Sequence, residues 1–502
     1  MFLMHMPSPD QNIIKKRPTI IECLRKIVPP DNFGENVIAD TFGLRAYECD
    51  GLSAYRQLPM VVVLPKTTEQ VSAILKYCDD FGIKVVARGA GTSLSGGALP
   101  LADAVVLGLG KFNRILNIDY ANRAVVTQPG VTNLSISEAV SDADFYYAPD
   151  PSSQVVCSIG GNVAENSGGV HCLKYGLTTN NLLGLEMVLM NGDIINLGGK
   201  HLDSEGYDLL GVVTGSEGLL GVITEVTLRI LRKPETARAM LVGFDSPTLA
   251  GDCVAEVISA GIIPGGMEMM DKLAIEATEE FVNAGYPSDV ETLLIIDLDG
   301  PRVEVIDLIS RVEKIAKRLG SEYIRVSETE TEREGFWAGR KAAFSAIGRI
   351  TPDYYCMDGT IPRKRLPEVL LQINAMSRKY KLRVANVFHA GDGNLHPLIM
   401  YDANKTGELE RAEDFGAEIL SLCVEVGGVL TGEHGVGVEK RDLMEKVFTE
   451  EDLKQQQRLK CAFDPNGLLN PGKVFPTLHR CAELGRVHIH KGQTRFSDIP
   501  RF

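Results

Sequence analysis

The chain of 502 residues is 44% hydrophobic and 24% charged, and its formal net charge is −14. This length predicts two or three packed domains, and the negative charge argues against a nucleic-acid partner, because phosphate-binding surfaces need an excess of Lys and Arg. No apolar run approaches the roughly 20 residues of a transmembrane helix, and the N-terminus lacks a secretory signal pattern. The ten cysteines contain no Cys-x-x-Cys pair, which excludes a disulfide framework and an iron–sulfur or zinc-knuckle ligand set. The composition predicts a cytosolic protein.

Helix and strand signals alternate in the first half of the chain. A helix is expected at 19–28, before Pro29-Pro30. A strand, a helix and a strand at 60–64, 68–81 and 84–87 form a βαβ unit, which predicts a parallel strand pair. Further strands are expected at 104–107, 115–118 and 124–127, in a hairpin over 185–197 that turns on Asn191-Gly192, and at 222–230.

The pattern changes after Lys233-Pro234, where strands alternate with longer helices. This arrangement predicts one antiparallel sheet covered by helices on one face, as a lid over a cofactor domain, and an α+β fold class. The expected strands are 240–244, 266–270, 292–298, 358–361 and 383–388, and the expected helices are 249–260, 272–284, 303–319, 330–344 and 366–380.

Two glycine-rich loops are the densest signal: RGAGTSLSGGALP at 88–100 and SIGGNVAENSGG at 158–169. Loops so poor in side chains let backbone N–H groups close on an anion, and two of them predict a ligand with a long phosphate bridge. Leu94 stands where a Rossmann fingerprint needs glycine, and no Gly-Lys-Ser/Thr triplet forms a P-loop. Gly160 and Gly161 are expected to open a helix or turn whose free amides face the anion.

A second constellation lies in FHAGDGNLHP, where His389 and His396 flank a tight turn. If the flanks are strands of one hairpin, both imidazoles converge on one point, and Glu433 of TGEHGVG completes a ligand set for Zn²⁺, Mn²⁺ or Fe²⁺. The competing interpretation is a pair of hydrogen-bonded core histidines.

Two further residues are candidates for substrate chemistry. His434 is the best candidate base for removing a hydroxyl proton, with a capping histidine as the alternative. Arg340, in FWAGRKAAF, has the planar fork suited to a substrate carboxylate; the pattern alone favours a solvated helix face for Arg340 and Lys341 over this role.

Several longer motifs contain or accompany these candidate residues. They are YYAPDPSSQ, GGNVAENSGGVHCLKYGLT, TGSEGLLGVITEV, TPDYYCMDGTIPR, RVANVFHAGDGNLHPLI and, near the C-terminus, PTLHRCAE. In this order they resemble the vanillyl-alcohol oxidase type of flavoprotein, and within it the FAD-linked D-2-hydroxyacid dehydrogenase family, in the branch of bacterial glycolate oxidase D subunits. The resemblance implies a two-subdomain, PCMH-type FAD-binding domain under an antiparallel sheet with helices. The implied parts are an N-terminal helical segment (1–50), the FAD domain (51–235), a substrate cap (236–430) and a segment that returns to the FAD domain (431–502).

The resemblance also implies roles for individual residues. The metal ligands match His389, His396 and Glu433, the active-site histidine matches His434, and the carboxylate-binding arginine matches Arg340. Thr92 stands where covalent relatives carry histidine, which implies non-covalent FAD. The implied FAD contacts are Arg88, Gly89, Ala90, Gly91, Thr92, Ser93, Gly96, Gly97, Pro129, Gly130, Pro149, Asp150, Pro151, Ser152, Gly160, Gly161, Asn162, Gly168, Gly169, Gly176, Gly221, Ile223 and Asn470.

The function implied by the resemblance is FAD-dependent oxidation of glycolate to glyoxylate by hydride transfer, with help from the metal and His434. Hydroxyglutarate-type relatives carry polar groups near Cys356 and Leu398, and losing them fits a smaller substrate. The expected partners are a second flavin subunit and an iron–sulfur subunit, and the expected location is the cytoplasm, either free or at the inner face of the membrane through those partners. The alternatives are a D-lactate or other D-2-hydroxyacid dehydrogenase and a structural subunit that only holds flavin.

Overall fold

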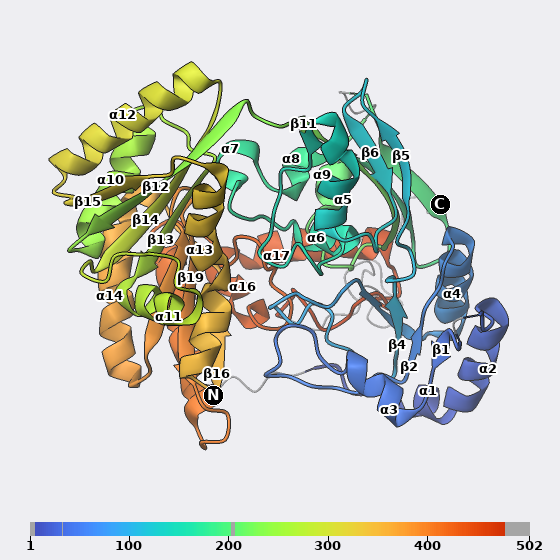
Figure 1. Ribbon diagram of the computed structural model, residues 1–502. Helices are drawn as coiled ribbons and strands as arrows, with labels where there is room; N and C mark the ends of the chain where they lie inside the picture. Colours follow the sequence, from blue (N-terminus) through green and yellow to red (C-terminus); the bar gives the residue numbers. More distant parts are fainter. Residues whose placement is uncertain (1–5, 33, 202–205, 477–502) are drawn as a thin grey trace, which may run out of the picture.

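The computed structural model describes residues 6–32, 34–201 and 206–476, and Figure 1 shows two sheet-based bodies side by side. The PTLHRCAE motif, apart from its first residue, and Cys481 lie outside the described residues. Within those residues, none of the helices combines the length and the apolar composition that a membrane crossing requires.

The first sheet has the strand order β1-β2-β4-β3. The helix α4 (Thr68–Phe81) connects β2 to β3; Thr67 caps its N-terminus and Gly82, at φ 67°, ends it. The predicted parallel pair was wrong in one respect, because β2 and β3 do not pair with each other: both pair with β4, which lies between them and is fully buried. The strands are β1 (Val37–Ile38), β2 (Val61–Val63), β3 (Lys84–Arg88) and β4 (Ala104–Gly108), and the helices before α4 are α1 (Gln11–Lys15), α2 (Arg17–Ile27) and α3 (Thr41–Leu44).

The second sheet is antiparallel, with the order β5-β6-β10-β8-β9. The predicted hairpin is confirmed as β8 and β9, and Gly192 of its turn has a φ of 90°. The strands are β5 (Ile115–Asp119), β6 (Ala124–Thr127), β8 (Leu182–Val188), β9 (Ile194–Gly198) and β10 (Val222–Arg229), with the small pair β7 (Phe145–Tyr146) and β11 (Leu231–Arg232); the helices are α5 (Asn133–Val140), α6 (Ile159–Glu165), α7 (Cys172–Tyr175), α8 (Thr178–Asn181) and α9 (Leu209–Val213).

The third sheet has eight strands, all of whose pairings are antiparallel. It is formed by β12 (Thr236–Phe244), β13 (Gly266–Asp271), β14 (Thr292–Gly300), β15 (Tyr323–Val326), β16 (Asp353–Cys356), β17 (Gly359–Thr360), β18 (Val384–His389) and β19 (Asn394–Tyr401). Its helices are α10 (Pro247–Ser259), α11 (Lys272–Val282), α12 (Arg302–Arg318), α13 (Glu330–Ile350), α14 (Leu366–Tyr380) and α15 (Glu408–Glu425). We call this body the cap.

The expectation that helices cover only one face of the cap sheet was wrong. Along β14, Leu294 and Ile296 belong to a core with α10, α12, α14 and α15, whereas Leu293 and Ile295 belong to a separate core with α11 and α13. Strand side chains alternate between the two faces of a sheet, so both faces are covered (Figure 1). The uninterrupted apolar run LLII in β14 was the available signal, since half-exposed strands alternate instead.

The C-terminal part of the described chain returns to the first sheet. After α16 (Met444–Val447) and α17 (Glu450–Phe463), Leu469 forms a parallel bridge with Val85 at the edge of β3. The chain therefore brings residues near 470 against the strand from which the first glycine loop leaves.

Candidate active site

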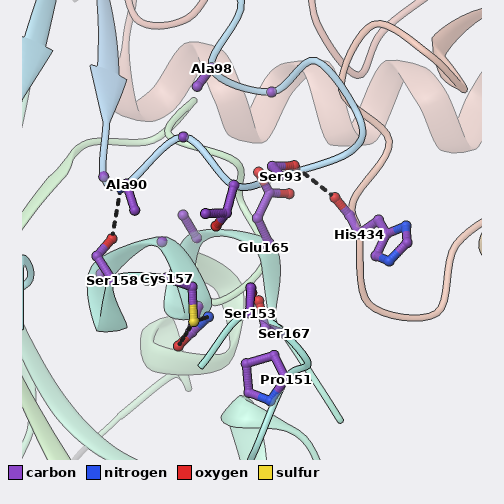
Figure 2. Close-up of a pocket in the computed structure, with 18 of the residues that line it drawn as sticks. Ala90, Ser93, Ala98, Pro151, Ser153, Cys157, Ser158, Glu165, Ser167 and His434 are labelled. Atoms are coloured by element: carbon purple, nitrogen blue, oxygen red, sulfur yellow. Dashed lines mark hydrogen bonds between the residues drawn. The ribbon is translucent and has the colours of Figure 1, made fainter. Parts of the chain in front are cut away.

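The two glycine-rich loops press against each other. A Cβ on Gly89 would overlap the Ser158 hydroxyl, and the Ala90 amide donates to Ser158 Oγ at 3.3 Å (Figure 2). In the same loop, Gly91 has a φ of 72°, and a Cβ there would overlap the Arg88 guanidinium, whose Nη1 donates to the Cys49 carbonyl. Both loops therefore form parts of one wall, as their common composition predicted.

The second loop uses part of its backbone for packing. The helix α6 opens after Ser158, but the Ile159 amide donates to the Val131 carbonyl at 2.9 Å and the Gly160 amide to the Pro129 carbonyl at 2.8 Å. The expectation of free amides was therefore wrong for Gly160. Its lack of a side chain is what lets α6 pack directly on Pro129.

These loops enclose one side of a cavity of about 400 Å³, a size within the range of ligand cavities. Most of the residues that the resemblance assigned to FAD lie in its wall. Those in the wall are Arg88, Gly89, Ala90, Gly91, Thr92, Ser93, Gly97, Pro129, Pro151, Ser152, Gly160, Gly161, Asn162, Gly221 and Ile223.

Other assigned residues do not line the cavity: Gly96, Gly130, Pro149, Asp150, Gly168, Gly169, Gly176 and Asn470. Several of them lie directly behind the wall. Gly169 passes so close to the Asp150 backbone that a side chain would overlap it. The buried Asn470 amide donates to the carbonyls of Gly97 at 2.9 Å and Glu217 at 2.7 Å. Such residues hold the loops in place rather than lining the cavity.

The sequence interpretation missed part of the wall. Glu165, at the end of α6, and Ser216, Glu217 and Gly218, in the loop before β10, line the cavity. On the cap side, Lys341, Phe344 and Ser345 line it from α13 at helical spacing. Glu165 could have been noticed, because it is a charged residue inside the glycine-rich loop.

The cap contributes a histidine–carboxylate cluster to the same cavity. His389 ends β18 and His396 lies in β19 of the predicted hairpin, on the same face of the sheet, with ring centroids 4.9 Å apart. Glu433 Oε1 lies 3.2 Å from His389 Nε2 and 3.4 Å from His396 Nε2. The structure thus brings the three predicted ligands together.

The geometry fits a divalent cation. Two ligand atoms bonded at about 2.1 Å to one tetrahedral ion stand about 3.4 Å apart. Both ring nitrogens of His396 are buried without a hydrogen-bond partner among the described residues, and its Nε2 lies 3.4 Å from both Asp358 Oδ1 and Glu433 Oε1. Buried polar atoms without partners are costly, and a cation bound by His389, His396 and Glu433 would remove that cost for His396.

Asp358 organises this cluster, and the sequence interpretation missed it. Its fully buried carboxylate accepts from the backbone amides of Gly432 at 3.0 Å and His434 at 2.9 Å, and from Lys440 Nζ at 3.2 Å. Although burial opposes ionisation, the positive charge of His434 when it is protonated, and that of Lys440, hold the pKa of Asp358 well below its usual range. Because donors surround this carboxylate, its role is to shape the turn that presents Glu433 and His434.

His434 stands at the junction of the two walls. Its ring stacks on His396 with centroids 5.0 Å apart, and its carbonyl accepts from the Ser93 hydroxyl of the first loop at 3.3 Å (Figure 2). Its Nδ1 is buried and has no hydrogen-bond partner among the described residues. Burial lowers the pKa of His434 to about 4, so the imidazole is neutral at neutral pH and can accept a proton.

Arg340 lies elsewhere than either sequence interpretation expected. It is buried on α13, and its Nε and Nη2 both donate to Glu268 Oε2, at 2.8 and 2.7 Å. The other oxygen of Glu268 lies 2.7 Å from His389 Nδ1. Arg340 is therefore not on a solvated helix face, and it does not line the cavity; Glu268 accepts from its Nε and Nη2. The following residue, Lys341, is the cation on the cap side of the wall, opposite a wall that contains Arg88 of the first glycine loop.

Comparison with known proteins gives consistent results. Residues 59–198 match the family described as "FAD binding domain" and residues 233–474 the family "FAD linked oxidases, C-terminal domain". The chain is 55% identical over 486 residues to "Glycolate oxidase subunit GlcD" of Escherichia coli (strain K12), covering 97% of each, and 38% identical over 455 residues to the protein of that name from Bacillus subtilis (strain 168), covering 90% of this chain and 96% of the relative.

The chain is also similar to more distant proteins. "D-lactate dehydrogenase" of Archaeoglobus fulgidus is 34% identical over 424 residues, covering 83% of this chain and 92% of the relative. Among solved structures, 4-ethylphenol oxidase from Gulosibacter chungangensis has a TM-score of 0.77 at 19% identity, covering 93% of this chain and 98% of the other. At that identity the likeness establishes the fold alone.

Proposed function

The chain belongs to the FAD-linked oxidases, and from this premise we propose that it oxidises glycolate to glyoxylate as the catalytic subunit of a glycolate oxidase assembly. The observation that carries this proposal is the 55% identity to the Escherichia coli glycolate oxidase subunit over 97% of both chains. The location of His434, between the FAD-loop wall and the cap wall of one cavity, supports it.

His434 is the base in this proposal. Oxidation of a 2-hydroxy acid removes the hydroxyl proton, and the bound FAD supplies the acceptor for the hydride from the α-carbon. A neutral buried imidazole receives that proton at a ring nitrogen, and His434 has such a nitrogen, unpartnered among the described residues. Asp358 holds the His434 backbone at 2.9 Å and so fixes where the ring stands.

His389, His396 and Glu433 would hold a divalent cation in this proposal. Such an ion, when bound, lowers the pKa of a coordinated hydroxyl and makes its proton easier to remove. Glu268 orients His389 from behind through its 2.7 Å contact with Nδ1, as carboxylates commonly do for histidine ligands. Arg340 in turn fixes Glu268.

Lys341 is the cation that the cap side of the cavity wall presents to the substrate carboxylate, and Arg340 supports the site from the layer behind. Cys356 and Leu398, which face each other across β16 and β19, are buried in the cap core and do not line the cavity. A single cation on the cap side of the wall favours a small 2-hydroxy acid with one carboxylate.

Electrons must then leave the flavin. The Escherichia coli relative is named as a subunit, and this chain has no cysteine pattern for an iron–sulfur cluster. We therefore extend the proposal to a second flavin subunit and an iron–sulfur subunit as partners, in the cytoplasm.

Anaerobic mixing of the purified chain with glycolate tests the proposal, with flavin absorbance as the readout. We expect bleaching by glycolate that is faster than with D-lactate. Faster bleaching by D-lactate would instead support a D-lactate dehydrogenase, and a flavin that no 2-hydroxy acid reduces would support a structural subunit. Removal of divalent cations with a chelator should slow bleaching while FAD stays bound; an unchanged rate would contradict the cation's role.

A further inference from the structure

The turn that carries His434 is bonded to both bodies of the molecule. On the cap side, the Asp358 carboxylate accepts from the backbone amides of Gly432 and His434. The chain then continues toward the FAD-domain wall through Gly435, whose φ is 85°. His434 therefore stands between a first anchor, Asp358, and the contacts that fix the residues after it.

The second anchor is Glu217, a buried residue of the loop before β10 that lines the cavity. Its Oε1 accepts from the Val436 amide at 2.7 Å, and its Oε2 accepts from the Gly437 amide at 2.7 Å. Hydrogen bonds from amides to a carboxylate are shorter and stronger than those between neutral groups. Both oxygens of Glu217 thus bind consecutive amides that begin two residues after His434.

Glu217 has an unusual backbone conformation. Its φ is 51°, in the left-handed region that residues other than glycine seldom adopt, and such strained residues cluster at active sites. The Asn470 side chain fixes this conformation by donating to the Glu217 carbonyl at 2.7 Å. Burial raises the pKa of Glu217, whereas the two amides and the charges of Lys440 and Lys473 favour its ionised form. The carboxylate is therefore held by a fixed backbone against the turn that carries His434.

The space between the two anchors leaves the turn little freedom. A Cβ on Gly435 would overlap Glu165 Oε2 and lie 3.0 Å from Glu217 Oε1, so the two glutamates meet at this point. Beyond it, the Ser95 carbonyl of the first glycine loop accepts from the Val438 amide at 3.0 Å. The turn is therefore bonded to the cap at its start and to the FAD-domain wall at its end.

We propose that Glu217 is a positioning residue, which fixes the imidazole of His434 relative to the FAD-domain wall. This inference rests on the proposed function, because His434 is the base of that reaction. The proton and the hydride leave adjacent atoms of one substrate, so the base and the flavin must keep a fixed separation although different bodies of the protein hold them. A misplacement of about 1 Å can slow a reaction about 100-fold.

Single-turnover reduction of the FAD-loaded chain by glycolate tests this proposal. Glu217→Gln keeps the shape of the side chain but replaces one acceptor oxygen with a donor, and Glu225→Gln, at a partly exposed glutamate outside the cavity wall, is the matched control. We expect flavin reduction at saturating glycolate to be about 10- to 100-fold slower in Glu217→Gln and unchanged in the control. If Glu217→Gln retains too little FAD, Glu217→Asp, which keeps the charge and shortens the side chain, replaces it.

A double-mutant cycle separates positioning from a merely structural role. If Glu217 acts through His434, the variant with both Glu217→Gln and His434→Ala should reduce its flavin no more slowly than His434→Ala does. A structural residue would instead lower FAD content or stability, and the flavin that stayed bound would be reduced at the wild-type rate. That result, or an additive loss of rate in the double variant, would overturn the proposal.

Hydrogen–deuterium exchange provides a readout that needs no substrate. The peptide that contains Val436 and Gly437 should exchange at least about tenfold faster in FAD-loaded Glu217→Gln than in the wild type or Glu225→Gln. If no 2-hydroxy acid reduced the wild-type flavin, the proposed function would fail, and exchange alone would decide whether Glu217 holds the turn. Unchanged exchange would overturn the proposal in either case.

Discussion

The two walls of the active-site cavity are made in different ways. The FAD-domain wall consists mainly of small residues and backbone, packed so tightly that a methyl group on Gly89 or Gly91 would overlap a neighbour. The cap wall presents the titratable side chains of Lys341 and His396, and His434 stands at its junction with the first wall, where the buried Asp358 carboxylate accepts from its backbone amide. The first wall therefore depends on shape and the second on charge, and substitutions should separate cofactor binding from chemistry.

The largest effect is expected at the charged wall, from His434→Ala. Loss of the base should lower turnover about 100- to 10,000-fold while FAD stays bound, since His434 does not belong to the glycine loops. Steady-state rates with an artificial electron acceptor, alongside the flavin absorbance of the purified protein, measure both. His201→Ala, at an exposed histidine, is the control. Near-normal turnover in His434→Ala would remove this residue from the mechanism.

In the shape-dependent wall, we expect the substitution Gly91→Ala to weaken FAD binding. The added methyl group overlaps the Arg88 guanidinium at a φ of 72°, so we expect FAD affinity to fall at least about tenfold. Gly82→Ala is a matched control: its φ is 67°, but a Cβ there meets nothing within 4 Å. That variant should lose about 1 kcal/mol of stability from backbone strain and bind FAD normally. Equal FAD affinity in both variants would contradict this account of the wall.

Arg340 and Lys341 offer a comparison between adjacent residues on α13. Arg340→Met leaves Glu268 buried without its partner, and we expect a loss of about 3–5 kcal/mol in the free energy of unfolding. Lys341→Met should change stability by less than about 0.5 kcal/mol and raise KM for glycolate about tenfold. Urea unfolding and steady-state kinetics measure the two effects. The conservative variant Arg340→Lys leaves Lys341 intact. If it raises KM for glycolate, the contact with the substrate carboxylate belongs to Arg340.

The smallest effect is expected at the seam between the walls. His171 Nδ1 lies 2.9 Å from Asp150 Oδ2, behind the FAD wall, and its Nε2 lies 3.7 Å from Asp297 Oδ2 in the cap strand β14. Burial opposes the charge, but the Asp150 and Asp297 carboxylates raise the pKa of His171 to about 10.

A raised pKa contributes stability that is complete below the unfolded value of about 6.5 and is lost as the pH rises through about 10. The difference in Tm between the wild type and His171→Gln should therefore shrink by a few degrees between pH 6.5 and 10. A difference that does not change with pH would mean that His171 is neutral in the folded protein.

The local elements of the fold were accessible from the sequence, and so was the family. The helices at 68–81 and 366–380 coincide with α4 and α14, because their caps and apolar periodicity are local. The FAD-linked fold and class are confirmed by the comparisons. The second face of helices on the cap sheet was missed, although β14 carried a readable signal in its unbroken apolar run.

The candidate site divides in the same way. The glycine loops and the turn between His389 and His396 can be recognised in the sequence, because a tight turn or a loop without side chains is encoded by a few consecutive residues. The residues that contact them in the folded protein cannot be recognised in this way. Asp358 reaches a turn 76 residues further along the chain at His434, and Glu268 meets His389 from 121 residues away.

The sequence by itself determined which segments can approach a phosphate bridge, which hairpin carries the histidines, and the class of flavoprotein. Only the tertiary structure decided that Glu268 occupies Arg340, that Asp358 is surrounded by donors, and that Glu165 meets Glu217. The reason is physical: ionisation and pairing of a carboxyl group depend on its burial and on donors from distant segments. For Glu217 these donors are amides from 219 and 220 residues away, and no local pattern records them.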